Sequence, residues 1–164
     1  MRRTSDRAFA REAAEGGMAE VKLGKLAENK ASNQAVKDFA QKMVQDHSAA
    51  NDQLKSAASQ ANITLPSRPS ETERATYTRL SKLSGTAFDR AYARDMVRDH
   101  EHDLAAFRRE ARNGRNDAIK SFASQTVPTL DQHLKLARRM DREVMGAGNH
   151  HHAAGMSSGT GTTQ

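Results

Sequence analysis

Residues 36–57 read VKDFAQKMVQDHSAANDQLKSA. Apolar or small residues recur in this segment every three or four positions, and lysine, aspartate and glutamine fill the positions between them. That spacing is typical of a helix with one buried face. We therefore expect a long amphipathic helix near residues 33–60. Its buried stripe is expected to be Val36, Phe39, Met43, His47, Ala50, Leu54 and Ala57.

The same spacing predicts three further long helices, near residues 5–29, 87–113 and 117–145. At the start of the third long helix, Thr86 and Asp89 have the spacing of a capping box. The 164-residue chain has 36% hydrophobic and 4% aromatic residues, which suits a thin, extended core. The sequence therefore predicts an all-α protein built as a four-helix bundle.

The connections between the four long helices indicate how they are arranged. Short loops join the first helix to the second and the third to the fourth, so each pair should form an antiparallel hairpin. Between the hairpins lie residues 62–85, which contain two prolines and predict a short helix near 70–82. Such a segment can cross the roughly 40 Å length of the second helix. We therefore expect up-down-down-up topology, with a long crossover between the second and third long helices.

Two of the seven histidines occur in nearly the same pentapeptide, MVQDH at 43–47 and MVRDH at 96–100. In parallel helices that begin at the same end of the bundle, both histidines lie about 21 Å from that end. The same estimate places a histidine of the fourth helix at about 18 Å and a glutamate of the first at about 14 Å. Each long helix thus contributes one inward-facing residue of a metal-binding type: Glu20, His47, His100 and His133.

Three imidazoles and one carboxylate suit a single transition-metal ion, either Zn²⁺, Cu²⁺ or non-haem Fe or Mn. Asp46 and Asp99 each precede a histidine, and they are candidates for orienting the imidazoles by hydrogen bonds. The alternative for these two aspartates is solvent-facing charge. The alternative for the site is a metal-free network in which Glu20 hydrogen-bonds to the histidines, because buried polar groups are costly unless paired.

A di-iron centre is not expected. Such centres in helical bundles use a glutamate on each of two helices and Glu-x-x-His on the other two. Here Leu130 stands three residues before His133, and Val44 stands three residues before His47. The chain also lacks HExxH, a nucleophile elbow and a phosphate-binding loop. We therefore predict a metal-binding protein rather than an enzyme. The alternative is a non-metal envelope or stress protein whose buried network is structural.

Charge and composition limit the partners. The net charge is +6, but acidic residues are interspersed among the basic ones, so no specific nucleic acid is expected. No apolar run approaches the roughly 20 residues of a membrane-spanning helix, and the first residues lack the apolar part of a signal peptide. We expect a periplasmic or exported protein if a signal segment has been removed, and a cytoplasmic one if the chain is complete. A second copy of the chain is a candidate partner.

The ends of the chain differ from the middle. Residues 146–164, GAGNHHHAAGMSSGTGTTQ, are rich in glycine, serine and threonine and have no periodicity, which is typical of disorder. The three histidines there, 150–152, are candidates for loose metal binding or simply for a solvated tail. We expect a flexible segment at 1–4, one bundle domain at 5–145 and a disordered tail at 146–164.

Several segments together carry a family resemblance. They are AEVKLGKLA (19–27), VKDFAQKMVQDH (36–47), LP (65–66), LSGTAFDRAYARDMVRDH (83–100), IKSFA (119–123) and VPTLDQHLKLA (127–137). Over roughly residues 8–140 the chain resembles the bacterial domain-of-unknown-function 4142 family, whose members are often labelled outer-membrane or periplasmic proteins. The resemblance implies a ferritin-like four-helix fold, and export signals that this chain does not show. It implies no established activity.

Overall fold

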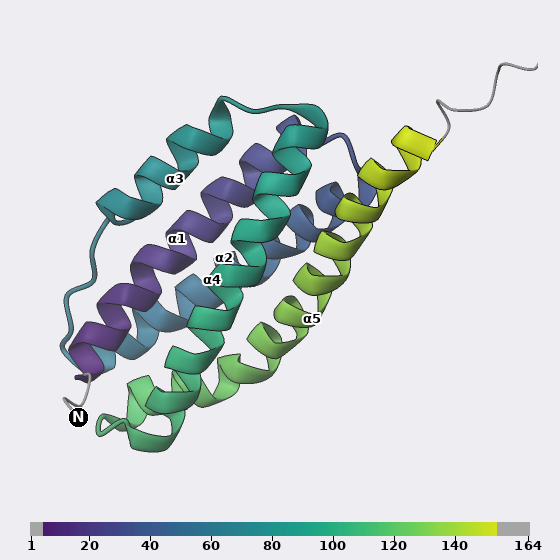
Figure 1. Cartoon of the computed structure of the whole chain (residues 1–164). Coiled ribbons are helices and arrows are strands. Elements are labelled where there is room, and N and C mark those ends of the chain that lie inside the picture. Colours follow the sequence, from purple (N-terminus) through teal and green to yellow (C-terminus); the bar gives the residue numbers. More distant parts are fainter. Residues whose placement is uncertain (1–4, 154–164) are drawn as a thin grey trace, which may run out of the picture.

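The computed structural model describes the backbone of residues 5–153 and the side chains of residues 5–146. This part of the chain is all-α, as predicted, and contains no strand (Figure 1). Residues 1–4 and 154–164, which belong to the expected flexible ends, lie outside the described residues. The last helix continues beyond residue 145, where we expected the bundle to end. The helices are α1 Asp6–Lys30, α2 Gln34–Gln60, α3 Glu71–Ser81, α4 Gly85–Asn113 and α5 Asp117–Ala153.

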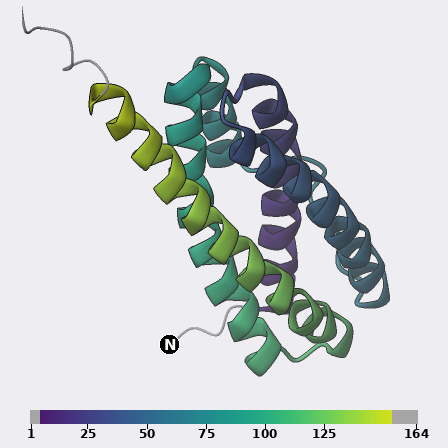
Figure 2. The ribbon, with the colours of Figure 1, turned by 90° about the vertical axis from the view of Figure 1, so that its right-hand side faces the viewer.

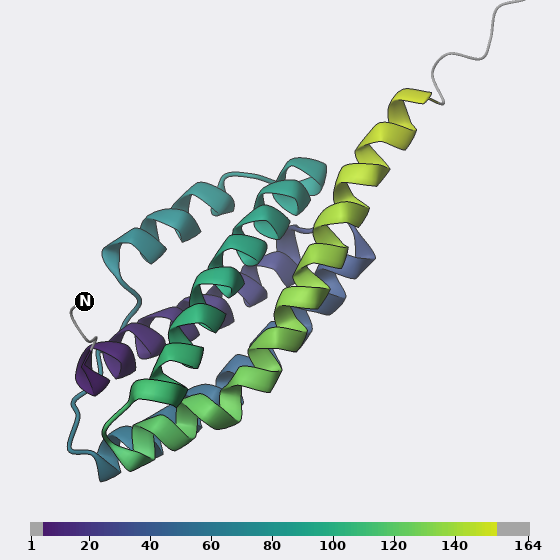
Figure 3. The ribbon, with the colours of Figure 1, turned by 60° about the horizontal axis from the view of Figure 1, so that its bottom comes forward.

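The four long helices have the predicted up-down-down-up arrangement. Figure 1 shows α2 and α4 running in one direction and α1 and α5 in the other. The closest packing lies within the two hairpins, α1 with α2 and α4 with α5 (Figure 2). The short helix α3 sits on the outside of the bundle, against α1 and α4 (Figure 3). Because each of α2 and α4 has α1 and α5 as packing neighbours, α2 and α4 occupy opposite corners.

Each hairpin holds the loop of the other through an aspartate. Asp6, in the first turn of α1, accepts hydrogen bonds from the backbone N–H groups of Arg115 and Asn116, just before α5. Asp89, on α4, accepts from the backbone N–H groups of Ser32 and Asn33, just before α2. The two hairpins are therefore locked together at both ends of the bundle.

The expected capping box of α4 does not form. The helix begins at Gly85 with Ser84 as its N-cap, and no side chain bonds the free N–H groups of its first turn. Asp89 cannot serve Thr86 because its carboxylate is already bonded to the loop before α2, including the Ser32 hydroxyl at 2.7 Å. A tertiary contact has thus replaced the local one that the spacing predicts.

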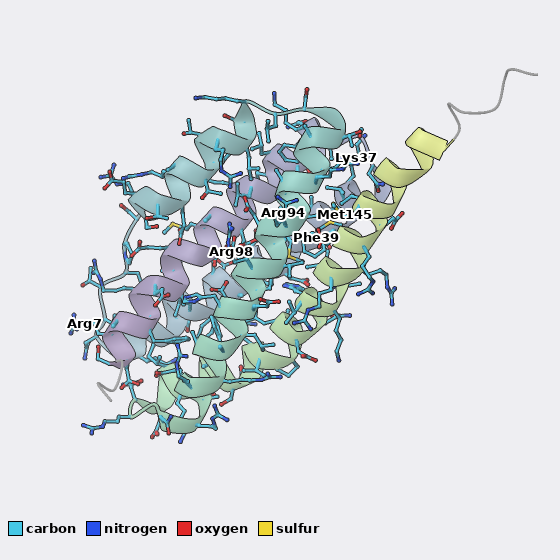
Figure 4. All side chains as sticks on the ribbon, viewed as in Figure 1. Arg7, Lys37, Phe39, Arg94, Arg98 and Met145 are labelled. Atoms are coloured by element: carbon cyan, nitrogen blue, oxygen red, sulfur yellow. The ribbon has the colours of Figure 1, made fainter. Side chains whose placement is uncertain are left out.

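The apolar core has two halves with a polar layer between them. One half packs around Phe39, Phe88 and Tyr92, and the other around Phe107 and Phe122. Figure 4 shows Phe39 between the helices, whereas Met145, on the projecting end of α5, is 43% exposed. Along α2 and α4 the buried residue that separates the two halves is a histidine, and on α5 the buried His133 lies beside Leu134, where the second half ends.

Two glycines allow α1 to lie close against α2. A Cβ at Gly17 would overlap the Asn51 side chain, and one at Gly24 would come within 2.8 Å of Val44. Gly16 is different, because a Cβ there would meet no atom within 4 Å. Gly17 and Gly24 therefore serve packing, whereas Gly16 borders open space.

Candidate metal site

Three of the four predicted ligands meet at the centre of the bundle. His47 on α2, His100 on α4 and His133 on α5 are 7%, 0% and 0% exposed. Their ring centroids are 5.2–5.8 Å apart, and one ring nitrogen of each lies within 4.8 Å of the other two. Positions that are far apart in sequence thus form one compact group, which we call the histidine trio.

Hydrogen bonds fix the tautomers of two of these rings. His100 Nδ1 lies 2.8 Å from the carbonyl oxygen of Met96, and His133 Nε2 lies 2.7 Å from the carboxylate of Asp46. A carbonyl and a carboxylate only accept, so both ring nitrogens must carry the proton. The lone pairs are therefore on His100 Nε2 and His133 Nδ1.

These lone pairs have no protein partner. His100 Nε2 and His133 Nδ1 are buried without a hydrogen-bond partner, and so is His47 Nε2. Each ring thus directs one unsatisfied nitrogen into the interior. Leaving a buried polar group unpaired costs about 1–3 kcal/mol, so the arrangement is expensive unless something else binds there.

Burial keeps the three rings neutral. It lowers the pKa of His47 well below the ordinary value, and the neighbouring His100 and His133 lower it further. Burial also lowers the pKa of His100 to about 4. For His133 burial again lowers the pKa, although the Asp46 carboxylate opposes the shift. Neutral imidazole is the form that binds a metal ion.

Asp46 lies where an orienting residue is expected. Its carboxylate accepts from His133 on the neighbouring helix, and Lys42 lies 3.0 Å from the same oxygen. Carboxylate, histidine and metal in series is the usual arrangement around metal-bound imidazoles in proteins. The Met96 carbonyl does the same for His100, because it accepts the hydrogen bond from that ring.

A small cavity adjoins the trio at His47. It has a volume of about 30 Å³, and its walls are mostly apolar, with Leu54, Phe107 and Phe122 among them. Asn51 adds an amide. The space suits one or two water molecules. A metal ion held by three imidazoles would therefore have room for a small additional ligand on the His47 side.

The structure does not bring Glu20 to the trio. Glu20 is buried, at 2% exposure, but it lies outside the group of neighbouring histidine nitrogens. It lines a separate cleft between α1, α3 and α4, together with Asp99. Helical spacing places Glu20 correctly on a buried face, but it does not tell which neighbouring helix that face meets.

The same cleft contains residues that the sequence pattern did not single out. Asp103 and Glu73 line it beside Glu20 and Asp99. The spacing of Asp99 and Asp103, one helical turn apart, was a signal that both share a face of α4. Glu73 carried a different signal, because it completes a capping box with Ser70 at the start of α3. Its place in the cleft follows only from how α3 packs.

Comparison with known proteins identifies the fold. A family model described as "Domain of unknown function (DUF4142)" matches residues 1–140. A crystal structure of the "putative secreted protein DUF305 from Streptomyces coelicolor" superposes with a TM-score of 0.70 at 16% identity. The match covers 86% of this chain and 94% of the other. No curated protein sequence is detectably similar. Among the described helices, none is long and apolar enough to cross a membrane.

Proposed function

The chain belongs to the DUF4142 family of domains of unknown function, and we propose that this member binds one transition-metal ion at the centre of its bundle. The proposed ligands are His47, His100 and His133. One observation carries the proposal: rings from three different helices each have a buried nitrogen without a hydrogen-bond partner, and one nitrogen of each ring lies within 4.8 Å of the other two. Burial keeps these rings neutral, and the two oriented hydrogen bonds leave the lone pairs of His100 and His133 free.

The metal-free network explains this geometry less well. It requires direct hydrogen bonds between Glu20 and the histidines, whereas Glu20 Oε2 has no hydrogen-bond partner among the described residues. His100 and His133 both present acceptors to the interior, so a single proton on His47 Nε2 could satisfy only one of them. A cation with empty coordination positions can accept all three lone pairs at once.

The donor set limits the choice of metal. Imidazole suits Zn²⁺, Cu²⁺, Fe and Ni²⁺, whereas Mg²⁺ and Ca²⁺ prefer oxygen ligands. Metal–nitrogen bonds of about 2.0–2.1 Å place the nitrogens of a tetrahedral site roughly 3.3 Å apart. Small movements of the three rings toward one another would therefore complete the site. The role we propose is storage, buffering or sensing of the ion, or stabilisation of the bundle by it.

The experiment is a metal titration of the full chain with His150, His151 and His152 replaced by alanine, which removes the tail histidines as competing ligands. Co²⁺ is the probe, because its visible absorption reports the ligands and geometry. We expect saturation near one ion per chain and loss of that absorption in His100→Ala. The matched control is Arg94→Ala, an exposed residue of the same helix that lines neither the cavity beside the trio nor the cleft. It should bind like the parent.

Two results would overturn the proposal. One is the absence of saturable binding of Co²⁺, Zn²⁺ and Cu²⁺ by the parent chain. The other is binding that survives in both His100→Ala and His133→Ala, which would place the ion elsewhere. Circular dichroism of each variant shows whether a loss of binding comes from unfolding instead.

We also propose that the protein acts outside the cytoplasm. The support is that a protein of similar fold, the structural neighbour from Streptomyces coelicolor, carries the description "putative secreted protein". The test is fractionation of cells that produce the natural protein, followed by immunodetection. The expected signal is in the periplasmic or external fraction, and a signal confined to the cytosol would contradict the proposal.

A further inference from the structure

A second polar region lies near the trio, between α1, α3 and α4. It is a cleft of about 450 Å³, which we call the acidic cleft. Although the protein carries a net charge of +6, this cleft gathers negative groups from three helices. The carboxyl groups that line it are Glu12, Glu20, Glu73, Asp99 and Asp103.

The basic residues of the cleft pair with carboxylates other than its innermost ones. Arg98, labelled in Figure 4, bonds to Asp95, which also pairs with Arg79 at 2.6 Å. His102 lies 2.8 Å from Glu12, at the outer part of the cleft. Among the described residues, no lysine or arginine forms an ion pair with the inner carboxyl groups, Glu20, Asp99 and Asp103.

Glu20 is the deepest of these carboxyl groups. Its side chain is 2% exposed, and Oε2 is buried without a hydrogen-bond partner while the residue lines the cleft. Burial raises the pKa of Glu20 well above the ordinary value, and neighbouring carboxylates raise it further. Burial likewise raises the pKa of Asp103 to about 7. A bound cation would remove this repulsion and provide the missing partner.

The acidic cleft and the cavity beside the trio are adjacent. Glu12, Gly16 and Asp103 line both of them, and His47 also lines the cavity. Gly16 stands at the junction, where a Cβ would meet no atom within 4 Å. A continuous series of lining residues thus leads from Glu20 and Asp103 past Gly16 to the first imidazole.

We propose that the acidic cleft binds divalent metal cations and passes them, at the junction beside Gly16, to the histidine trio. This inference rests on the proposed function, since it assigns the route by which the ion reaches that site. Carboxylates hold a hydrated divalent cation loosely through oxygen, whereas three imidazoles hold a transition-metal ion more selectively. The cleft therefore raises the local concentration of cations, and the trio selects among them.

The test separates rates from affinity. The tail-substituted full chain is mixed with Co²⁺ in a stopped-flow instrument, and dissociation is followed with a chelator in excess. Gly16→Leu should slow both association and dissociation while leaving the dissociation constant unchanged, because it narrows the route without touching the ligands. A leucine in a helix is also favoured over glycine by roughly 1 kcal/mol, so this variant should fold. Gly16→Ala is the control, because it adds only a methyl group, and its association and dissociation rates should be close to those of the parent.

The second arm replaces carboxyl groups of the cleft, which lose their proton when a cation binds, by neutral amides. Glu20→Gln and Asp103→Asn should each slow association, together by about tenfold at low salt, the lower end of electrostatic enhancement. High salt should shrink the difference from the parent. Asp52→Asn, which removes an exposed carboxylate of α2, is the matched control and should leave the rate unchanged.

The outcomes distinguish the two proposals. Slow association in Gly16→Leu and in the charge variants, with unchanged affinity, supports the route. Parent-like rates in all of them, with Co²⁺ still bound by the trio, overturn the route and leave the metal site intact. No binding of Co²⁺ by the parent overturns both.

Discussion

The pentapeptides MVQDH of α2 and MVRDH of α4 have almost the same sequence. Their histidines lie in the same place, but their aspartates have different neighbours. His47 and His100 meet in the trio, as their equal depth predicts. Their preceding aspartates separate: Asp46 bonds His133 on α5, whereas Asp99 lies in the acidic cleft beside Glu20 of α1. The same local spacing thus gives one residue a place beside the proposed metal and the other a place in the cleft.

The arrangement of the bundle explains this difference. The parallel helices α2 and α4 stand at opposite corners, and a half-turn about the bundle axis exchanges them while exchanging α5 with α1. A side chain that precedes the inward histidine by one position is rotated about 100° from it along the helix. On α2 this rotation turns the Asp46 side chain toward α5, and on α4 it turns the Asp99 side chain toward α1. When a motif is repeated on diagonal helices, the inward residues of the two copies therefore meet at the bundle axis. The residues beside them contact different helices.

The largest expected difference between the two aspartates is in their effect on metal affinity. Asp46→Asn should weaken metal binding about 10–100-fold, as is usual when a carboxylate behind a metal-bound imidazole is lost. Asp99→Asn should leave the affinity unchanged and slow association only, because Asp99 faces the cleft. Titration with Co²⁺ and a competing chelator measures both. Equal losses of affinity in the two variants would mean that Asp99 orients an imidazole as Asp46 does.

A second prediction concerns stability without metal. Glu20→Leu should raise the free energy of unfolding by about 1–2 kcal/mol, because it removes a buried carboxyl whose oxygen has no partner. It should also slow metal association, because the same carboxyl that destabilises the fold helps to capture the cation. Such a trade-off between stability and function is common at functional sites. Denaturant unfolding in the presence of a chelator measures the first effect.

The control for this prediction is Glu28→Leu on the same helix, where the side chain is exposed. A change at such a surface position usually stays within about 0.5 kcal/mol. If Glu20→Leu were clearly destabilising, Glu20 would have to make a stabilising interaction in the folded protein. The acidic cleft would then contain no unpaired carboxyl group at Glu20.

The fold was predictable because helical spacing and loop length act over short distances. The stripe from Val36 to Ala57 fixes the buried face of α2, and the length of segment 62–85 fixes the direction of α4. The depth of His47 and His100 followed from the helix starts and the direction of α4. The depth of His133 followed from the short loop before the last helix. The end of the last helix did not follow from spacing, since α5 continues to Ala153 although glycine is a poor helix former.

The parts of the site that could not be predicted depend on packing between elements. Helical spacing places Glu20 on the correct face of α1, but the neighbour of that face is set by where α3 and α4 lie. Asp89 had the spacing of a helix cap, yet it bonds the loop before α2. The spacing of Asp99 and Asp103 indicates a shared face of α4, but not that carboxyl groups of α1 and α3 lie beside it. Each of these depends on contacts between residues far apart in sequence.

The last prediction concerns Glu110, another buried carboxyl, which shows what burial does where no candidate metal site is adjacent. Burial raises the pKa of Glu110 to about 8, and its bond to the Asp6 carboxyl contributes to the rise. A carboxyl whose pKa is higher in the folded than in the unfolded chain stabilises the fold fully at low pH. That contribution is lost as the pH rises through about 8. The metal-free parent should therefore lose part of its stability between about pH 5 and pH 8.

Glu110→Gln tests this directly, because the amide keeps a donor toward Asp6 at every pH. Thermal unfolding of the parent and the variant, both with chelator, should differ least near pH 5 and most near pH 8, with the variant the more stable there. Taking the difference between the two removes the contribution of the histidine trio, whose lowered pKa values destabilise both proteins equally at low pH. A constant difference across this range would mean that Glu110 ionises as an ordinary surface glutamate does. Burial alone would then not account for the raised pKa values of the acidic cleft either.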